Sequence, residues 1–225
     1  MPTAVAIDGP AGAGKSTIAR SVAEKLGFIY VDTGALYRAV ALASLRAGTD
    51  ISDSAQVDSL LDSIKIELCF DMEKGQTVML NGEDVSPLIR TEEISMRASA
   101  VSAIAQVRAF LLGLQRSIAQ ENNVIMDGRD IATVVLPNAD VKIFLTASAE
   151  TRARRRCAQL CEKGENAEYA DVLRDVEQRD YNDSHREIAP LKPSADSVIA
   201  DTTYLTLEQS AELIENIIKD GRKGL

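Results

Sequence analysis

The residues Gly9-Pro10-Ala11-Gly12-Ala13-Gly14-Lys15-Ser16-Thr17 follow a short apolar run near the start of the chain. All but the last of them match the P-loop pattern G-x-x-x-x-G-K-[ST]. Glycines allow successive backbone N–H groups to turn inward around phosphates, where a Cβ atom would clash. Lys15 can then reach the β and γ phosphates of ATP, and the Ser16 hydroxyl can bind Mg²⁺. We therefore expect residues 9–17 to bind ATP, with Lys15 acting in catalysis.

The flanking residues have the order that a P-loop requires. Residues 4–8 form an apolar run typical of a buried parallel strand. Apolar residues then recur every four positions from Ile18 to Leu26, as on one face of a helix. A second strand is predicted at 28–31 and a second helix at about 35–47. This alternation predicts an α/β doubly wound fold and makes a chance glycine-rich turn the weaker interpretation.

Between about residues 50 and 88 the pattern becomes antiparallel. Residues 65–70 alternate apolar and polar side chains, and residues 77–80 run into Asn81-Gly82, a strong hairpin signal. We expect a small subdomain here, inserted into the parallel core. The stretch at about 91–120 is helical, and its many Ala and Ser residues indicate more than one helix.

The remaining residues return to the parallel pattern, with strands predicted at 124–127, 141–145 and 197–200. Ser148 is a good N-cap for the arginine-rich helix after it. A second helix is expected at about 167–183, and Thr206 to Gln209 fit a capping box for a C-terminal helix. We divide the chain into a core (1–49, 89–150 and 184–225), an insert (about 50–88) and a lid (about 151–183).

The composition restricts the class of protein. Hydrophobic residues make up 45% of the 225 residues, enough for a packed core. The net charge of −9 argues against a general nucleic-acid binder, which needs a basic face. Three cysteines match no secreted disulfide framework, and neither a signal peptide nor an apolar run of about 18 residues is recognisable. We expect a cytoplasmic protein, monomeric by default, that contacts no membrane.

The second predicted strand is followed by Asp32-Thr33-Gly34-Ala35-Leu36-Tyr37-Arg38, at the sheet edge where open α/β sheets bind ligands. Arg38 can hold a second phosphate with two hydrogen bonds, and Tyr37 can pack beside it. A helix start with an exposed arginine is the alternative interpretation. This segment is therefore a candidate for the acceptor side of a kinase.

Another predicted core strand ends in Asp127-Gly128-Arg129-Asp130, in the same crevice at the ligand-binding edge of the sheet. Asp127 is a candidate to hold a water ligand of Mg²⁺, in the manner of a Walker-B carboxylate. Arg129 is a second candidate to bind phosphate, and Asp130 is available as a hydrogen-bond acceptor. A turn capped by an aspartate explains Asp130 alone but not all four residues.

Two further clusters of charge lie in the predicted lid or just after it. Arg152, Arg154, Arg155 and Arg156 give one helix a dense positive face, which we expect to close over the triphosphate. The alternative is a solvated surface. Arg179, Asp183 and Arg186 are spaced to share one helical face, where a surface ladder of ion pairs is the alternative.

Other reactive side chains in this region are not assigned to the site. His185, the only histidine, is expected on the helix surface. Cys157 and Cys161 share a helix face, but no further ligand completes a metal site, so we interpret them as packing residues.

Taken together, these segments resemble the bacterial cytidylate kinase family. The resemblance is carried by the P-loop, D-T-G-A-L-Y-R at 32–38, D-G-R-D-I-A-T-V-V-x-P at 127–137, K-I-F-L-T-A-S at 142–148, R-D-x-x-D-x-x-R at 179–186 and A-P-L-x-P-x-A-D at 189–196. It implies a P-loop NTPase core with a parallel sheet flanked by helices, an inserted antiparallel monophosphate-binding subdomain and a helical lid. It also implies that ATP, with Mg²⁺, phosphorylates CMP and dCMP.

The resemblance further implies roles for individual residues. Arg38, Arg129 and Arg186 would bind the CMP phosphate, and Arg129 and Arg186 would act in catalysis. Ser99, Arg108 and Asp130 would surround the cytosine edge. The sugar side would be formed by Thr33, Arg179 and Asp183, with Tyr37 nearby and Arg155 of the lid on ATP. Thr33 stands where some members have serine, and the hydroxyl is kept.

Two other classes of function share part of this pattern. A kinase for another small acid would share the P-loop and lid, but not the pair D-G-R-D and R-D-x-x-D-x-x-R. A nucleotide-dependent switch would use the insert as a partner surface, and the arginines in the acceptor crevice argue against it. A GTPase would need N-K-x-D, which does not occur.

Overall fold

The computed structural model describes residues 2–71, 75–162, 164 and 166–223. Parallel strands form its main sheet in the order β2-β6-β1-β7-β8. Their bounds are β1 (Ala4–Asp8), β2 (Ile29–Asp32), β6 (Val124–Gly128), β7 (Val141–Thr146) and β8 (Val198–Asp201). Each lies within one residue of the strand predicted from the sequence, so the parallel core is confirmed. The P-loop follows β1, the central strand.

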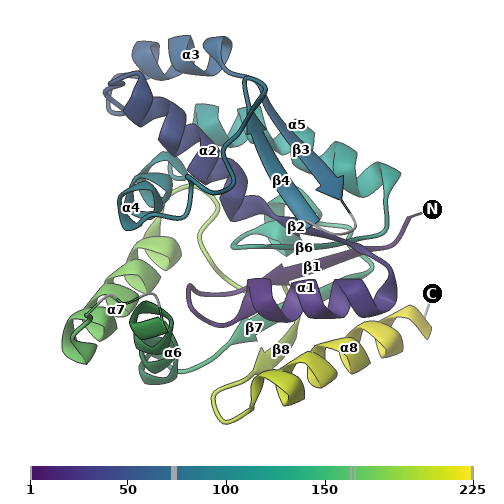
Figure 1. Ribbon diagram of the computed structural model, residues 1–225. Helices are drawn as coiled ribbons and strands as arrows, with labels where there is room; N and C mark the ends of the chain where they lie inside the picture. Colours follow the sequence, from purple (N-terminus) through teal and green to yellow (C-terminus); the bar gives the residue numbers. More distant parts are fainter. Residues whose placement is uncertain (1, 72–74, 163, 165, 224–225) are drawn as a thin grey trace.

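Helices cover both faces of this sheet (Figure 1). α1 (Lys15–Leu26) and α8 (Leu207–Lys223) pack on one face, and α5 (Ala105–Glu121) packs on the other. Successive side chains of a strand point to opposite faces. Val5 and Ile7 of β1 accordingly pack with α1 and α8, whereas Ala6 between them packs with α5.

The insert forms an antiparallel sheet of β3 (Ile66–Asp71), β4 (Gly75–Leu80) and β5 (Glu83–Asp84). Asn81 and Gly82 make the turn between β4 and β5, with φ angles of 50° and 83°. This left-handed pair is what a two-residue hairpin turn requires, and the predicted hairpin is confirmed. The insert also contains α3 (Ser54–Ser63), a helix that our sequence interpretation did not include.

One apolar core joins the insert to α2 (Thr33–Arg46), α4 (Glu92–Val101) and α5. Its buried side chains include Val40 of α2, Leu60 of α3, Val78 of β4 and Ile94 of α4. The predicted stretch at 91–120 is indeed two helices, since α4 and α5 meet at 99°. That bent pair meets the length and composition of a membrane span, but no single helix among the described residues does.

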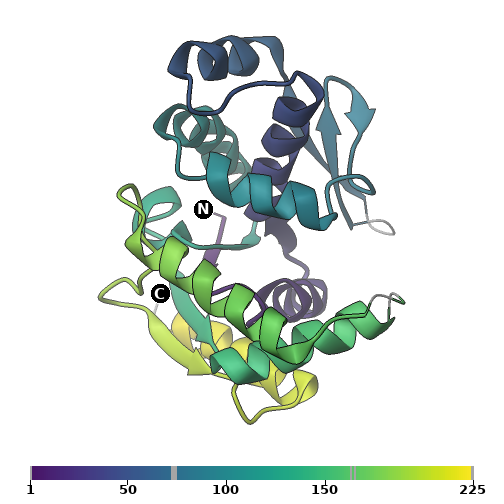
Figure 2. The ribbon, with the colours of Figure 1, turned by 90° about the vertical axis from the view of Figure 1, so that its left-hand side faces the viewer.

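The region predicted as the lid, for which we keep that name, contains α6 (Ala149–Glu162) and α7 (Tyr169–His185), which pack on each other through Ala153, Val172 and Val176. Both predicted caps are confirmed. The Ser148 hydroxyl accepts a hydrogen bond from the Thr151 N–H at 3.2 Å. At the start of α8, Thr206 and Gln209 exchange the capping-box bonds at 2.9 and 3.2 Å. In Figure 2 the two lid helices, drawn in green, face α4, drawn in blue-green.

Candidate active site

A cleft of about 680 Å³ separates the lid and P-loop from α2 and α4. Every residue predicted on the acceptor side lines it: Thr33, Tyr37, Arg38, Ser99, Arg108, Arg129, Asp130, Arg179, Asp183 and Arg186. Of the predicted ATP-binding residues, six from the P-loop and Arg155 line the same cleft, whereas Gly9, Pro10 and Ala13 do not. Segments far apart in the sequence thus meet in one cavity.

The P-loop backbone depends on glycine at its two ends. Gly9 has a φ of 151°, and a Cβ atom there would lie 1.9 Å from the Leu145 carbonyl oxygen of β7. Gly14 precedes α1 with a φ of 91°, a conformation that disfavours other residues. The loop can therefore lie against β7 and still direct its N–H groups toward an anion.

The Lys15 ammonium is buried over this loop. Its Nζ donates to the carbonyl oxygens of Gly9 and Pro10 at 2.7 and 2.8 Å. Burial, together with the nearby Arg129 guanidinium, lowers the pKa of Lys15 from its ordinary value. A phosphate in the cleft would oppose this effect by stabilising the charged form.

Ser16 and Asp127 place two oxygen atoms beside the P-loop. The Ser16 hydroxyl donates to an Asp127 carboxylate oxygen at 2.8 Å, and the Tyr30 hydroxyl lies 3.3 Å from the other oxygen. Burial and the Asp32 carboxylate raise the pKa of Asp127. Hydroxyl and carboxylate oxygens are the hard ligands that Mg²⁺ prefers, so this pair fits the ion expected from the sequence. No cluster of three or more His, Cys, Asp or Glu side chains suited to a metal occurs among the described residues.

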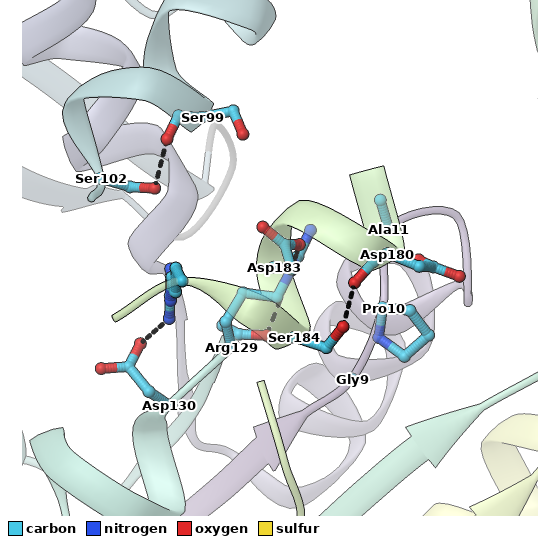
Figure 3. A network of polar contacts seen from close by, with 12 residues as sticks. Gly9, Pro10, Ala11, Ser99, Ser102, Arg129, Asp130, Asp180, Asp183 and Ser184 are labelled. Carbon is cyan, nitrogen blue, oxygen red and sulfur yellow. Dashed lines mark hydrogen bonds and ion pairs between the residues drawn. The ribbon is translucent and has the colours of Figure 1, made fainter. Parts of the chain in front are cut away.

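Arginine–aspartate pairs line the acceptor end of the cleft. Arg129 Nε lies 2.7 Å from Asp183, and these side chains point toward one another in Figure 3. Asp130 pairs with Arg108 and, at 3.4 Å, with Arg186. The paired residues come from α5, from the segment after β6, from α7 and from the position just after α7. The predicted acceptor groups therefore include two sets of ion-paired side chains at this end of the cleft, which together we call the acceptor network.

A further arginine–aspartate pair lies at the start of α2. Arg38 Nη2 lies 2.7 Å from an Asp32 carboxylate oxygen, and the same carboxylate caps α2 by accepting the Ala35 N–H at 3.0 Å. The Arg38 side chain is 19% exposed. The alternative of a freely exposed arginine is therefore wrong.

The cleft has an excess of positive charge. Its lining includes eight basic side chains (one Lys and seven Arg) and five acidic ones (four Asp and one Glu). Two guanidinium Nε atoms, of Arg38 and Arg179, are buried and have no hydrogen-bond partner among the described residues. Burial and the Arg129 charge lower the pKa of Arg179. Buried donors without partners are costly, and a bound anion would satisfy them.

Residues from three parts of the chain line this end of the cleft. Ser99 lies on α4, Arg108 on α5 and Asp130 after β6, and Arg108 lies 6.0 Å from the centre of the Tyr37 ring. Thr33 Oγ1 donates to the Asp127 carbonyl oxygen at 2.8 Å. The Thr33 hydroxyl therefore uses its one proton to bind the backbone near the end of β6. It can still accept a hydrogen bond from a ligand but cannot donate one.

The structure corrects three expectations about the lid. The arginines of α6 do not form one face: Arg152 is buried and pairs with Asp180, Arg154 is exposed, and Arg155 reaches the Thr202 carbonyl oxygen at 2.8 Å. The helical spacing alone gave no sign that Arg152 joins α6 to α7. Arg156 instead bridges to Glu92 of α4 at 2.9 Å.

The second and third corrections concern Arg186 and Cys161. Arg186 lies just past the end of α7, in an extended conformation, so it does not share a helical face with Arg179 and Asp183. Cys161 is exposed and does not pack, whereas Cys157 is partly buried in the lid core. His185 is on the surface as expected, stacked on Tyr181.

Sequence reasoning missed the roles of two aspartates. Asp8 at the end of β1 accepts the Ile131 and Ala132 N–H groups at 2.7 and 2.8 Å, which anchors the π-helical turn after Asp130. Asp32 caps α2 and holds Arg38, as described above. Both occur where a strand ends, and that position was the available signal.

Comparison with known proteins gives one family. Residues 5–220 match the sequence model of cytidylate kinase. A cytidylate kinase from Lactobacillus gasseri is 50% identical over 220 residues, covering 97% of this chain and 95% of that protein. One from Carboxydothermus hydrogenoformans is 48% identical over 219 residues, covering 97% of each. With this identity over nearly the whole length, and with the P-loop core and acceptor network in place, the chain belongs to the cytidylate kinase family.

Proposed function

We propose that this protein transfers the terminal phosphoryl group of ATP to CMP and dCMP, forming ADP and CDP or dCDP. The observation that carries the proposal is the single cleft in which the P-loop faces a network of arginines and aspartates. A P-loop accounts for the donor. The second group of arginines includes two buried Nε donors, of Arg38 and Arg179, that have no partner in the described part of the chain, and these call for a second anion across the cleft.

The donor half comprises residues 9–17 and Arg155. Backbone N–H groups and the start of α1 hold the phosphates, and Lys15 compensates the charge of the transferred group. Ser16 would hold Mg²⁺, with Asp127 fixing a water ligand, and the ion would neutralise charge on the triphosphate oxygens.

The acceptor half comprises the remaining predicted residues. Arg38, Arg129 and Arg186 bind the CMP phosphate, and Arg129 and Arg186 also stabilise the charge that spreads over the transferring group. Ser99, Arg108 and Asp130 read the cytosine edge. The sugar lies by Thr33, Tyr37, Arg179 and Asp183.

In the reaction, a phosphate oxygen of CMP attacks the γ-phosphorus of ATP in line. The new P–O bond forms as the bond to the β–γ bridging oxygen breaks, and ADP leaves with that electron pair. The second ionisation of a phosphate monoester lies near pH 6, so the acceptor is already deprotonated at neutral pH. No general base is needed, which agrees with the surface position of His185. The lid would exclude water, which would otherwise hydrolyse ATP.

An assay of ADP release with CMP, dCMP, UMP and AMP in turn tests this function. We expect turnover with CMP and dCMP, its loss in EDTA and its return with excess Mg²⁺. The proposal would be contradicted if AMP were the one monophosphate that supports ADP release. Release of ADP in the absence of any monophosphate would contradict it as well. The division into core, insert and lid, the monomeric state and the cytoplasmic location remain predictions.

A further inference from the structure

The side-chain amide of Gln76 binds the backbone of Asp32. The Asp32 N–H donates to Gln76 Oε1 at 2.7 Å, and Gln76 Nε2 donates to the Asp32 carbonyl oxygen at 3.3 Å. Asp32 ends β2, an edge strand of the main sheet, so its outward N–H and C=O have no neighbouring strand. The amide of Gln76 thus takes the place of a strand at this one position.

Asp32 is also held through its side chain. Its carboxylate accepts bonds from the Ala35 N–H and from Arg38 Nη2. One residue therefore connects β4 of the insert to the guanidinium that faces the acceptor phosphate. Any shift of the Asp32 backbone would move the carboxylate that orients Arg38.

The Gln76 contact is not what attaches the insert to the rest of the molecule. Val78 and Leu80 of the same strand are only 2% and 4% exposed, and they lie in the apolar core shared with α2 and α4. Gln76 itself is half-buried near the other end of β4. Loss of its two hydrogen bonds should therefore leave the insert folded.

We propose that Gln76 is a positioning residue for the acceptor phosphate: it fixes the end of β2 so that Asp32 presents Arg38 to that phosphate. This inference rests on the proposed function. Phosphate recognition by a guanidinium is directional, and a flexible arginine side chain loses binding free energy when it must be ordered on binding.

The test compares CMP with cytidine, which lacks the phosphate, by calorimetry on the full-length protein. Gln76→Met keeps an unbranched side chain of similar length but removes both hydrogen bonds. We expect about a threefold to tenfold weaker affinity for CMP, the scale of one or two neutral hydrogen bonds, with cytidine and ATP affinities unchanged. The unfolding midpoint should fall only modestly, because two backbone groups of Asp32 lose their partners while the apolar core keeps the insert folded. Thr77→Ala, on the next residue of β4, is the matched control and should change neither affinity.

A double-mutant cycle makes the role of Arg38 explicit. In an Arg38→Met background, Gln76→Met should weaken CMP binding no further, because the group that it positions is absent. If Gln76→Met does not fold, Gln76→Glu serves instead, because its second carboxylate oxygen would face the Asp32 carbonyl oxygen. It should weaken CMP binding in the same selective way.

The inference would be overturned if Gln76→Met weakened the affinities for CMP and cytidine equally, or if the two substitutions had additive effects in the cycle. Either result would mean that Gln76 stabilises the site in general and does not act through Arg38. Unchanged CMP affinity would overturn it as well. Each of these results leaves the proposed function standing. A wild-type protein that does not bind CMP would instead refute the proposed function and this inference together.

Discussion

Arg129 Nε lies 2.7 Å from an Asp183 carboxylate oxygen, a contact that joins the residue just after β6 to lid helix α7 across 54 positions of sequence. Burial disfavours the charge of Asp183, yet the Arg129 guanidinium holds the pKa of Asp183 below its ordinary value. The same pairing raises the pKa of Arg129 in spite of its burial. The position of the lid and the orientation of the arginine that we propose to bind phosphate are therefore linked.

Arg129→Ala should lower turnover with CMP by about 100-fold or more, because a preorganised positive group at the transferring phosphate is lost. ATP binding should remain nearly intact, since the P-loop contacts are separate. Steady-state kinetics with CMP and equilibrium binding of ATP measure the two effects. Arg174→Ala is the control: Arg174 is an exposed arginine of α7 that pairs only locally with Asp171, and its loss should change neither quantity. Lost ATP binding with normal use of CMP would reverse the assignment.

Arg108→Met should reduce the preference for CMP over UMP by at least about tenfold, because it removes the partner that holds Asp130 at the base edge. The affinity for ATP should change less than this preference. The ratio of kcat/KM for the two monophosphates is the measurement. An unchanged ratio would show that Arg108 does not read the base.

Asp8 should make folding stability depend on pH. Burial raises the pKa of Asp8 from its ordinary value of 3.8 to about 6, in spite of the two backbone hydrogen bonds that favour its charge. Between these values the folded protein keeps the proton that the unfolded chain loses, so the free energy of unfolding falls as the pH rises. This contribution is about 3 kcal/mol across the window, since each pH unit is worth about 1.4 kcal/mol.

Urea denaturation of the wild type and Asp8→Asn at several pH values measures this effect. The asparagine does not titrate, so the stability of the wild type relative to the variant should fall between pH 3.8 and about 6 and then level off. A relative stability that is constant or rises across that window would contradict the raised pKa.

Gly128→Ala should destabilise the protein by about 1–3 kcal/mol through overpacking. The new Cβ would lie 2.7 Å from both Thr33 Oγ1 and Ile131 Cδ1, and the hydrogen bond of Thr33 limits its movement. Gly113→Ala in α5 is the matched control, because nothing lies within 4 Å of its Cβ position. It should stabilise the protein by about 0.5–1 kcal/mol through helix propensity. Equal effects at both glycines in thermal unfolding would refute the steric argument.

The features that could be predicted were local ones. The P-loop, the Asn81-Gly82 turn and the capping box of Thr206 and Gln209 each depend on residues within a few positions, and each formed as expected. Helix α3 was also predictable, since Asp53 is a good N-cap and Val57, Leu60 and Leu61 recur on one face. The contacts of Arg152, Arg155 and Arg156 were not predictable, although these residues are close neighbours on one helix. Arg152 contacts α7, Arg155 contacts the segment after β8 and Arg156 contacts α4.

The sequence by itself determined the strand order along the chain, the phosphate-binding loop and the residue types of the acceptor half, because short-range geometry and motif spacing suffice for these. Only the tertiary structure decided which aspartate each arginine meets, and that Gln76 binds the backbone of Asp32 and Asp8 the backbone of Ile131 and Ala132. The physical reason is that such contacts depend on where parallel strands end and how the lid and insert pack against them. Those positions are set by the whole core and not by neighbouring residues.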